Sequence, residues 1–369
     1  MKLSKKNILF IVSITVSIVC TWLFIRNIDW LLLKNALRDA NYWFIIPTLI
    51  LTLLVYVVRA FRWQVLLSHI KRISVVNLLS VTSIGFMANN ILPARVGEVL
   101  RPFLLSKKED VKFSTSFATV IVERIFDMLA LILFTVMVIA FLPHSPAINQ
   151  EIVGAAASHV CTVRESIVPS LKKWTEVFAA VGVITIVCLF FVVIKPDFFK
   201  RILSEMCFFL PHTIKDKILG LYESFVYGLK ILEDKTQTGW IMVLSFFIWI
   251  LGGAEIYLLG FSFHMHLPFV GACLVAVCLA LAVALPQAPG YIGVFHIAVL
   301  KSLHIFGIET TAAQSYAIVL WAISILPSTV MGFFFLWREG IAFREVVKLE
   351  EEIVEGKLEE MEGVTREIK

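Results

Sequence analysis

Seven ionisable residues lie within long apolar stretches of the chain, where an isolated charge would be costly. They are three arginines and four acidic residues: Arg95, Glu98, Arg101, Glu123, Arg124, Asp127 and Glu255. Charged side chains at membrane depth usually face a cavity or pair with one another, and they often mark functional sites. Arginine binds phosphate oxygens through two N–H donors, and helix N-termini present free backbone amides. These residues therefore predict a site for an anionic, phosphate-bearing ligand.

Two of the carboxylates are spaced to act together. Glu123 and Asp127 are four residues apart in an apolar helix and share one face, whereas Arg124 is turned away by about 100°. Arg95 or Arg101 could pair with either carboxylate simply to hold neighbouring helices together, or could contact a ligand directly. The sequence leaves both interpretations open, and they can coexist.

The composition defines the elements that must position these residues. Of the 369 residues, 59% are apolar and 17% are charged, whereas a soluble domain carries about 25% charged residues. Apolar stretches of about 20 residues span a bilayer as helices, which excludes a single water-soluble core. We expect an all-α polytopic membrane protein with about six full spans, at residues 7–25, 42–60, 114–142, 174–194, 240–262 and 311–337.

Two further apolar regions, 74–105 and 268–303, are interrupted at their centres. The interruptions contain Asn89, Asn90, Pro93 and Gly97 in the first region, and Pro286, Pro289, Gly290 and Gly293 in the second. Proline removes an amide donor and disfavours helix in the residue before it, so each region should form two half-helices around a turn. Irregular backbone at membrane depth must be covered by protein or face water. The pattern therefore predicts two re-entrant helical hairpins.

The distribution of basic residues orients this arrangement. Most of the 33 lysines and arginines fall on one side if both hairpins return to the side from which they enter. By the positive-inside rule, that side is cytoplasmic, with both termini on it, and the protein is expected in the plasma membrane. The two hairpins then enter from opposite sides. Together with a shared P-x-x-[VI]-G pattern at residues 93–97 and 289–293, this favours an inverted repeat with a central site.

The remaining segments have simpler predictions. Residues 1–340 form the membrane domain, in which 195–238 is a cytoplasmic loop containing an interfacial helix. Residues 341–369 form a charged cytoplasmic tail. The six cysteines include no C-x-x-C pair, and we expect no metal, no cofactor, no catalytic residue and no nucleic-acid partner.

Three strings resemble a known family. They are NNILPARVGEVLR at residues 89–101, ERIFDMLAL at residues 123–131, and PGYIGVF at residues 289–295. They are similar to motifs of the lysylphosphatidylglycerol synthase transmembrane-region, or flippase-like, family, although Tyr291 departs from the usual P-G-G-x-G. The resemblance implies the membrane part that moves a lipid across the bilayer. The cytosolic synthase domain of the bifunctional members is not expected here, because about 30 residues follow the last span.

These features predict a transporter that moves an anionic or phosphate-bearing lipid, either a phospholipid or a polyprenyl-linked lipid, between leaflets. The sequence contains no G-x-x-x-x-G-K-[ST] loop, so transport would be facilitated or ion-coupled. Glu123, Asp127 or Glu255 would carry a proton; Glu255 could instead be a substrate-facing group or an inward residue bonded to a neighbouring helix. The alternatives are a scaffold partner of a lipid- or glycan-biosynthesis enzyme and an intramembrane lipid-modifying enzyme.

Overall fold

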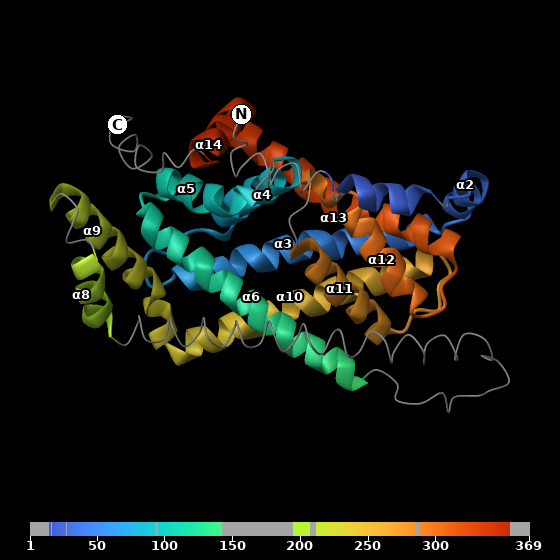
Figure 1. Cartoon of the computed structure of the whole chain (residues 1–369), viewed down its shortest axis with the longest axis horizontal. Coiled ribbons are helices and arrows are strands. Elements are labelled where there is room, and N and C mark those ends of the chain that lie inside the picture. The colour runs from blue at the N-terminus through green and yellow to red at the C-terminus, as the bar shows by residue number, and fades with distance from the viewer. Residues whose placement is uncertain are drawn as a thin grey trace.

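The computed structural model describes residues 15, 17–26, 28–92, 95–141, 195–206, 212–284 and 288–354. Within these ranges helices form and no strand does, which confirms the all-α prediction (Figure 1).

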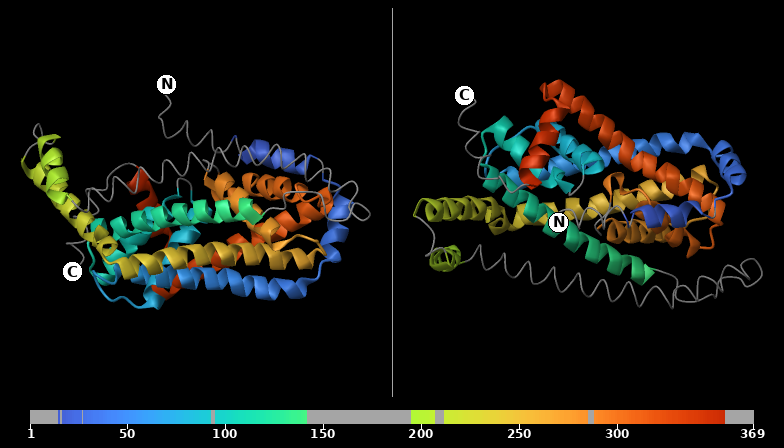
Figure 2. Two further views of the ribbon diagram at one scale, coloured as in Figure 1. Left: turned by 90° about the horizontal axis from the view of Figure 1, so that it is seen from below. Right: turned by 45° about the horizontal axis from the view of Figure 1, so that its top comes forward.

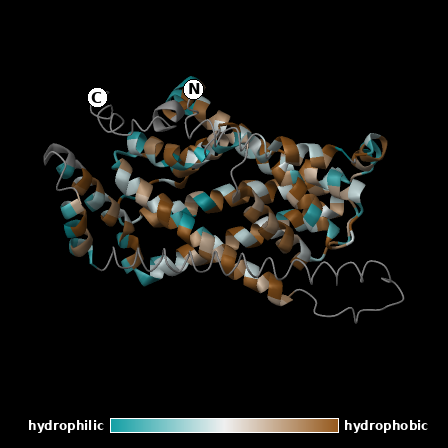
Figure 3. Cartoon of the chain, viewed as in Figure 1, coloured by the Kyte–Doolittle hydropathy of each residue, from teal (hydrophilic) through white to brown (hydrophobic). Residues whose placement is uncertain are grey.

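Four of the helices are long and apolar enough to cross a membrane. They are α3 (Ile45–Leu67), extended at its start by the short 3-10 helix η1 (Tyr42–Phe44), α6 (Phe113–Phe141), α10 (Lys235–Ser262) and α13 (Thr310–Glu339). They correspond to four of the six predicted spans. Large apolar side chains such as Trp43, Ile50 and Val330 are more than half exposed on them, as expected where helices face lipid. Figure 3 shows hydrophobic residues along most of the length of these helices.

The predicted end of the second span was wrong. We expected this span to end at residue 60, but α3 continues to Leu67, because Trp63, Leu66 and Leu67 are all fully buried. Of the other two predicted spans, 174–194 lies outside the described residues. In the predicted span 7–25, residue 15 and residues 17–25 are described and are helical.

Both interrupted regions form the expected pairs of half-helices. In the first, α4 (Val75–Ile91) is followed by α5 (Gly97–Glu109); in the second, α11 (Phe269–Ala284) is followed by the turn η5 (Pro289–Tyr291) and α12 (Val294–His304). Pro93 and Pro286 lie outside the described residues. Gly290 and Gly293 have φ angles of 70° and 84°, a region that glycine adopts without steric cost.

The two hairpins open at opposite ends of α13, as Figures 1 and 2 show. At one end, Lys108 of α5 pairs with Glu339, the last residue of α13. At the other, the side chains of His304 in α12 and Thr310, the first residue of α13, lie 3.3 Å apart. Since α13 has 30 residues and is about 45 Å long, the hairpins approach from its two ends.

The turns of the two hairpins meet between these ends. Arg95 in the first turn donates a hydrogen bond to the backbone oxygen of Val283, near the end of α11. A Cβ placed on Gly290 in the second turn would lie 3.7 Å from the backbone oxygen of Asn90. The indole of Trp321 on α13 donates to the carbonyl of Gly290 at 2.7 Å. The hydrogen bond between Arg95 and Val283 joins segments that are 188 residues apart in the sequence.

Each hairpin has its own hydrophobic core. The first, around α4 and α5, includes Trp63, Leu66 and Phe126. The second, around α11 and α12, includes Phe134, Val299 and Tyr316. The long helices contribute one part to each core, so the molecule consists of two packed halves that share α3, α6, α10 and α13 as connecting elements.

Helices outside the membrane-spanning set cover the ends. They are α2 (Trp30–Arg38), α8 (Pro196–Met206), α9 (His212–Leu229), η4 (Lys230–Glu233) and α14 (Phe343–Val354). In the loop predicted at 195–238, α9 packs on α6 through a close contact of Gly228 with Ala118. The predicted tail begins with α14, and its Val346 is buried in the first core.

A glycine-to-alanine substitution tests the packing of the first hairpin. A Cβ on Gly97 would lie 1.9 Å from the carbonyl oxygen of Gly85, so Gly97→Ala should separate α4 from α5 and cost about 1–3 kcal/mol or more. The unfolding midpoint in detergent measures this effect. As a control, Gly252→Ala in α10 meets nothing within 4 Å and should leave the midpoint unchanged or slightly higher. Equal midpoints for the two variants would contradict the packing.

Candidate functional site

The centre of the site is Glu123 on α6, whose side chain is not exposed at all. Its carboxylate lies 3.1 Å from a nitrogen of Arg62 on α3, 3.1 Å from both terminal nitrogens of Arg101 on α5, and 2.6 Å from Arg124. Two of these arginines are themselves buried. A buried charge is stable only when it is paired and hydrogen-bonded, and here three cations from three helices compensate one carboxylate.

Local packing holds Arg101 in place. Its guanidinium stacks on the ring of Trp63 at 4.4 Å from the ring centroid, a cation–π contact. Gly85 on α4 makes room for it, since a Cβ there would lie 2.3 Å from Cγ of Arg101. The sequence left open whether Arg101 pairs with a carboxylate, and the structure pairs it with Glu123.

Asp127 is the second carboxylate of the site and shares a helix face with Glu123, as its spacing predicts. Arg62 donates to both of its oxygens, and Arg124 lies 3.4 Å away. The remaining polar contact of Arg62 is with the hydroxyl of Ser245 on α10, at 2.7 Å. The Arg62–Asp127 ion pair and the Arg62–Ser245 hydrogen bond therefore connect α3, α6 and α10.

Arg59 and Arg62 are two arginines of the cluster that the sequence prediction missed. The prediction ended the span at residue 60 and counted Arg62 among the basic residues of a cytoplasmic loop. A usable signal was present, because the apolar run continues after Arg62 through Trp63, Val65, Leu66 and Leu67. An arginine that interrupts an apolar helix should have been included among the buried candidates.

The cluster carries more positive than negative charge. Four arginines, Arg59, Arg62, Arg101 and Arg124, face three carboxylates, Glu98, Glu123 and Asp127. Among the described residues, Arg59 has no ion pair within 4 Å; its guanidinium lies over the ring of Phe86, at 5.2 Å from the centroid. An excess of one guanidinium in a largely buried cluster favours the binding of an anion.

The accessible edge of the cluster lies beside the meeting point of the two hairpin turns. Arg124 and Glu98 are each 35% exposed and approach only to 3.9 Å, a loose pair. Nε of Arg124 has no hydrogen-bond partner in the described part of the chain. Tyr291 from the second turn interacts electrostatically with these two residues and with Arg95, which is exposed. Nε of Arg124 is buried, so a ligand at the edge would meet the exposed part of the Arg124 guanidinium and residues from both hairpins.

The asparagines and glycines of the turns have structural partners. Asn89 caps α5 by accepting the N–H of Gly97 at 2.8 Å, and Asn90 donates to the hydroxyls of Ser328 and Thr329 on α13 at 2.9 and 3.1 Å. We expected the glycine gaps to let backbone approach a ligand. At Gly97 the gap is filled by Gly85 and Asn89, and at Gly293 by the helix around residues 17–21.

Glu255 does not join the cluster. It is 9% exposed on α10, in the half formed around the second hairpin, where it interacts with Thr52, Tyr56 and Tyr316. Thr52 and Arg62 both lie on α3, ten residues or about 15 Å apart. Glu255, which interacts with Thr52, is therefore remote from the cluster around Arg62. The oxygen Oε1 of Glu255 has no hydrogen-bond partner among the described residues.

The described chain contains no group of three His, Cys, Asp or Glu residues that could hold a metal ion.

The fold and the site define a class of protein: a multi-pass helical membrane protein with two opposed helical hairpins and a buried arginine–carboxylate cluster where they meet. Residues 10–332 match the lysylphosphatidylglycerol synthase TM region family, and the chain belongs to that family. The resemblance seen in its motifs is thereby confirmed.

Several curated proteins are similar to most of the chain. A UPF0104 membrane protein of Methanocaldococcus jannaschii is 23% identical over 343 residues, 90% of this chain and 94% of that protein. A UPF0104 membrane protein of Pyrococcus horikoshii is 24% identical over 336 residues, 89% of this chain and 95% of that protein. Glycosyltransferase AglD of Haloferax volcanii is 23% identical over 239 residues, 63% of this chain and 38% of that protein.

Removing the central carboxylate tests the cluster. Glu123→Gln leaves buried arginines undercompensated, and we expect a loss of about 3–5 kcal/mol in the free energy of unfolding, measured by denaturant titration in mixed micelles. As a control, Glu109→Gln removes the partner of the 46% exposed Lys71 and should cost about 1 kcal/mol or less. A loss for Glu123→Gln no larger than that of the control would show that Glu123 does not hold the cluster together.

Proposed function

We propose that the protein transports a phosphate-bearing lipid, a phospholipid or a polyprenyl-linked lipid, between the two leaflets of the membrane. The observation that carries this proposal is the partly exposed Arg124, which lies in a net positive cluster beside the turns of two opposed hairpins. A phosphate group bound there would lie near the middle of the long helices, between the two sides of the membrane.

The binding step follows from the contacts of Arg124. Of its three acidic neighbours, Glu123 at 2.6 Å and Asp127 at 3.4 Å are closer than Glu98 at 3.9 Å. A phosphate oxygen would replace Glu98, the weakest of the three, and accept a bond from the terminal nitrogen of Arg124 that faces Glu98. The two buried carboxylates would keep the other guanidinium groups fixed, so binding would need little rearrangement of the cluster.

The transport step uses the division into two halves. Each hairpin has its own apolar core, and the described parts of the turns touch through contacts such as that of Arg95 with the carbonyl of Val283. Rocking of one half against the other would break and re-form this junction and expose the phosphate to one side and then the other. This is the alternating-access scheme expected for opposed re-entrant hairpins around a central site.

The orientation follows from charge. The end that contains the opening of the first hairpin, α9 and α14 carries many lysines and arginines, whereas few lie at the other end. We place the first end in the cytoplasm, with both termini there, and the protein in the plasma membrane.

Because the sequence has no nucleotide-binding loop, movement of the lipid would be facilitated or coupled to an ion. Glu255, a buried carboxyl whose oxygen Oε1 has no hydrogen-bond partner among the described residues, is the candidate for carrying a proton.

Substitution of Arg124 tests this function. In proteoliposomes, Arg124→Gln should reduce the rate of transfer of a labelled anionic phospholipid between leaflets by about tenfold, because one charged hydrogen-bonding group is lost. Arg338→Gln, which changes an exposed arginine at the end of α13, is the matched control and should transfer lipid at the wild-type rate. Wild-type transfer by Arg124→Gln, or no transfer of anionic lipid by the wild-type protein, would sink the proposal.

A second candidate is a membrane partner of a glycan-biosynthesis enzyme, which the similarity to glycosyltransferase AglD favours. In that role the tail at 341–369 would be required and Arg124 would be replaceable, the reverse of what transport requires. Complementation of a deletion strain distinguishes the two, with the outer-leaflet lipids and surface glycans as the readout. We expect a truncation after Val354, which keeps the buried Val346 of the first core, to complement and Arg124→Gln to fail; the opposite result would support the partner role.

A further inference from the structure

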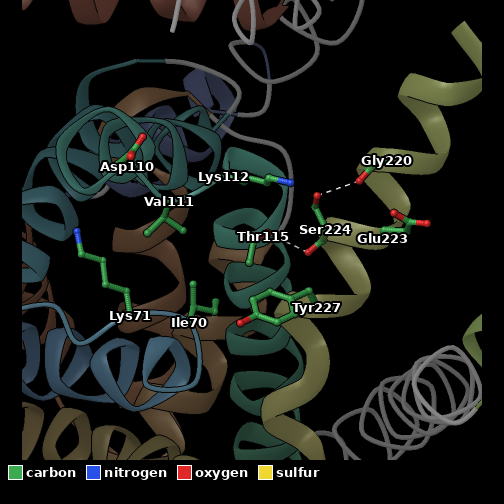
Figure 4. Close-up of a pocket in the computed structure, with 10 residues that line it drawn as sticks. All are labelled: Ile70, Lys71, Asp110, Val111, Lys112, Thr115, Gly220, Glu223, Ser224 and Tyr227. Carbon is green, nitrogen blue, oxygen red and sulfur yellow. Dashed lines mark hydrogen bonds between the residues drawn. The ribbon is translucent and has the colours of Figure 1, made fainter. Parts of the chain in front are cut away.

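A cavity of about 460 Å³ lies at the end of the molecule where the first hairpin opens, away from the arginine cluster. Its walls come from α9 and from the two segments that connect α3 to α4 and α5 to α6 (Figure 4). Ile70 and Val111 supply apolar surface, and Lys71, Lys112, Thr115 and Tyr227 supply polar groups.

The cavity lies at the depth where membrane-spanning helices end. Helix α3 ends at Leu67, three residues before Ile70, and α6 begins at Phe113, directly after Lys112. The phospholipid headgroups lie at this level of a bilayer. Tyr227, 43% exposed on α9, is of a type enriched at this level, since its ring is apolar and its hydroxyl is polar. The location indicates a ligand that arrives with the membrane.

Two of the charged groups in the wall are already paired. The ammonium of Lys71 lies 2.9 Å from the carboxylate of Glu109. Glu223 accepts a hydrogen bond of 2.5 Å from Lys200, and this bond and the positive charge lower the pKa of Glu223. Glu223 therefore stays ionised at neutral pH, and its charge is compensated within the protein.

Two other charged groups in the wall are unpaired. Asp110 and Lys112 are both exposed, and neither side chain makes a hydrogen bond or an ion pair within 4 Å with a described residue, although the charge of Lys112 acts on Glu223. Asp110 ends α5 in the left-handed conformation, at φ 53°, so the chain leaves the helix there and lines the cavity through Val111 and Lys112. In Figure 4, Lys112 extends toward Gly220 and Ser224 on α9. The cavity thus offers a cation and an anion whose side chains have no hydrogen-bond partner among the described residues.

The hydroxyl groups add a further preference. Thr115 donates to the carbonyl of Ser224 at 3.0 Å, and Ser224 donates to the carbonyl of Gly220 at 2.9 Å. With their hydrogens engaged, both oxygens can only accept further bonds. The wall therefore suits a ligand that brings N–H donors as well as a negative charge.

We propose that this cavity binds the headgroup of a zwitterionic phospholipid with a primary ammonium group, of the phosphoethanolamine type. The phosphate lies at Lys112 and the ammonium at Asp110, with its N–H groups directed to the hydroxyl oxygens of the wall. A quaternary ammonium has no N–H to donate, and a purely anionic headgroup would leave Asp110 unpaired beside it. The site is separate from the arginine cluster and does not depend on transport.

Binding of lipids to the purified, full-length protein tests the site. We would measure by native mass spectrometry the binding of phosphatidylethanolamine, phosphatidylcholine and phosphatidylglycerol with identical acyl chains. The wild-type protein should bind phosphatidylethanolamine most tightly. Lys112→Gln should weaken that binding by about tenfold, which corresponds to one charged hydrogen bond. Lys107→Gln, at an exposed lysine in the last turn of α5 outside the cavity, is the control and should bind normally.

Asp110→Asn provides the more specific readout. It should remove the preference for phosphatidylethanolamine over phosphatidylglycerol while retaining binding of both, because it changes only the partner of the ammonium. Equal binding of the two lipids by the wild-type protein, or the same loss in Lys107→Gln as in Lys112→Gln, would overturn the proposal. Soluble O-phosphoethanolamine should compete only weakly; competition as strong as that of the lipid would reassign the site to a free metabolite.

Discussion

The carboxylate of Glu123 has no contact with solvent, and the rest of the structure depends on how its charge is compensated. Guanidinium groups from α3, α5 and α6 surround it, so the first hairpin can only dock where Arg101 reaches this carboxylate. Removing a charge from water costs several kcal/mol, and only well-oriented opposite charges and hydrogen bonds offset that cost. The cluster therefore specifies one arrangement of these helices, and apolar contacts such as those of Trp63 and Leu66 stabilise it.

The same requirement creates a functional opportunity. To compensate two carboxylates deep in the protein, the helices bring together more guanidinium groups than the carboxylates neutralise; among the described residues Arg59 has no ion pair, and the accessible edge at Arg124 and Glu98 is only loosely paired. A site that is rigid at its centre and incompletely paired at its edge can bind an anion without reorganising. The second hairpin contributes Tyr291 and the carbonyl of Val283 to this edge, so its environment depends on how the two halves sit against each other.

The division into two halves has a separate physical origin. Close packing of α4 on α5 requires residues without a side chain at positions 85 and 97. Docking of the second turn on the helix around residues 17–21 requires the same at position 293. Each hairpin is tightly packed internally, and the described contacts between the turns include the hydrogen bond from Arg95 to the carbonyl of Val283. The headgroup cavity under α9 lies within the first half, at the membrane surface, and so can be occupied in any relative position of the halves. The two proposed binding sites, at the arginine cluster and in this cavity, are therefore physically independent.

The sequence alone determined the membrane class, the helical content, the positions of the interrupted helices and the shared face of Glu123 and Asp127. These follow from composition, from proline chemistry and from helical periodicity, which act over a few residues. It also gave most members of the cluster, because a charge within an apolar run is visible without a fold. Only the tertiary structure decided that Arg101 pairs with Glu123, that Arg62 completes the cluster, and that Glu255 lies in the other half. Those outcomes depend on which helices face each other across long stretches of chain, and side-chain spacing within a single helix carries no information about its neighbours.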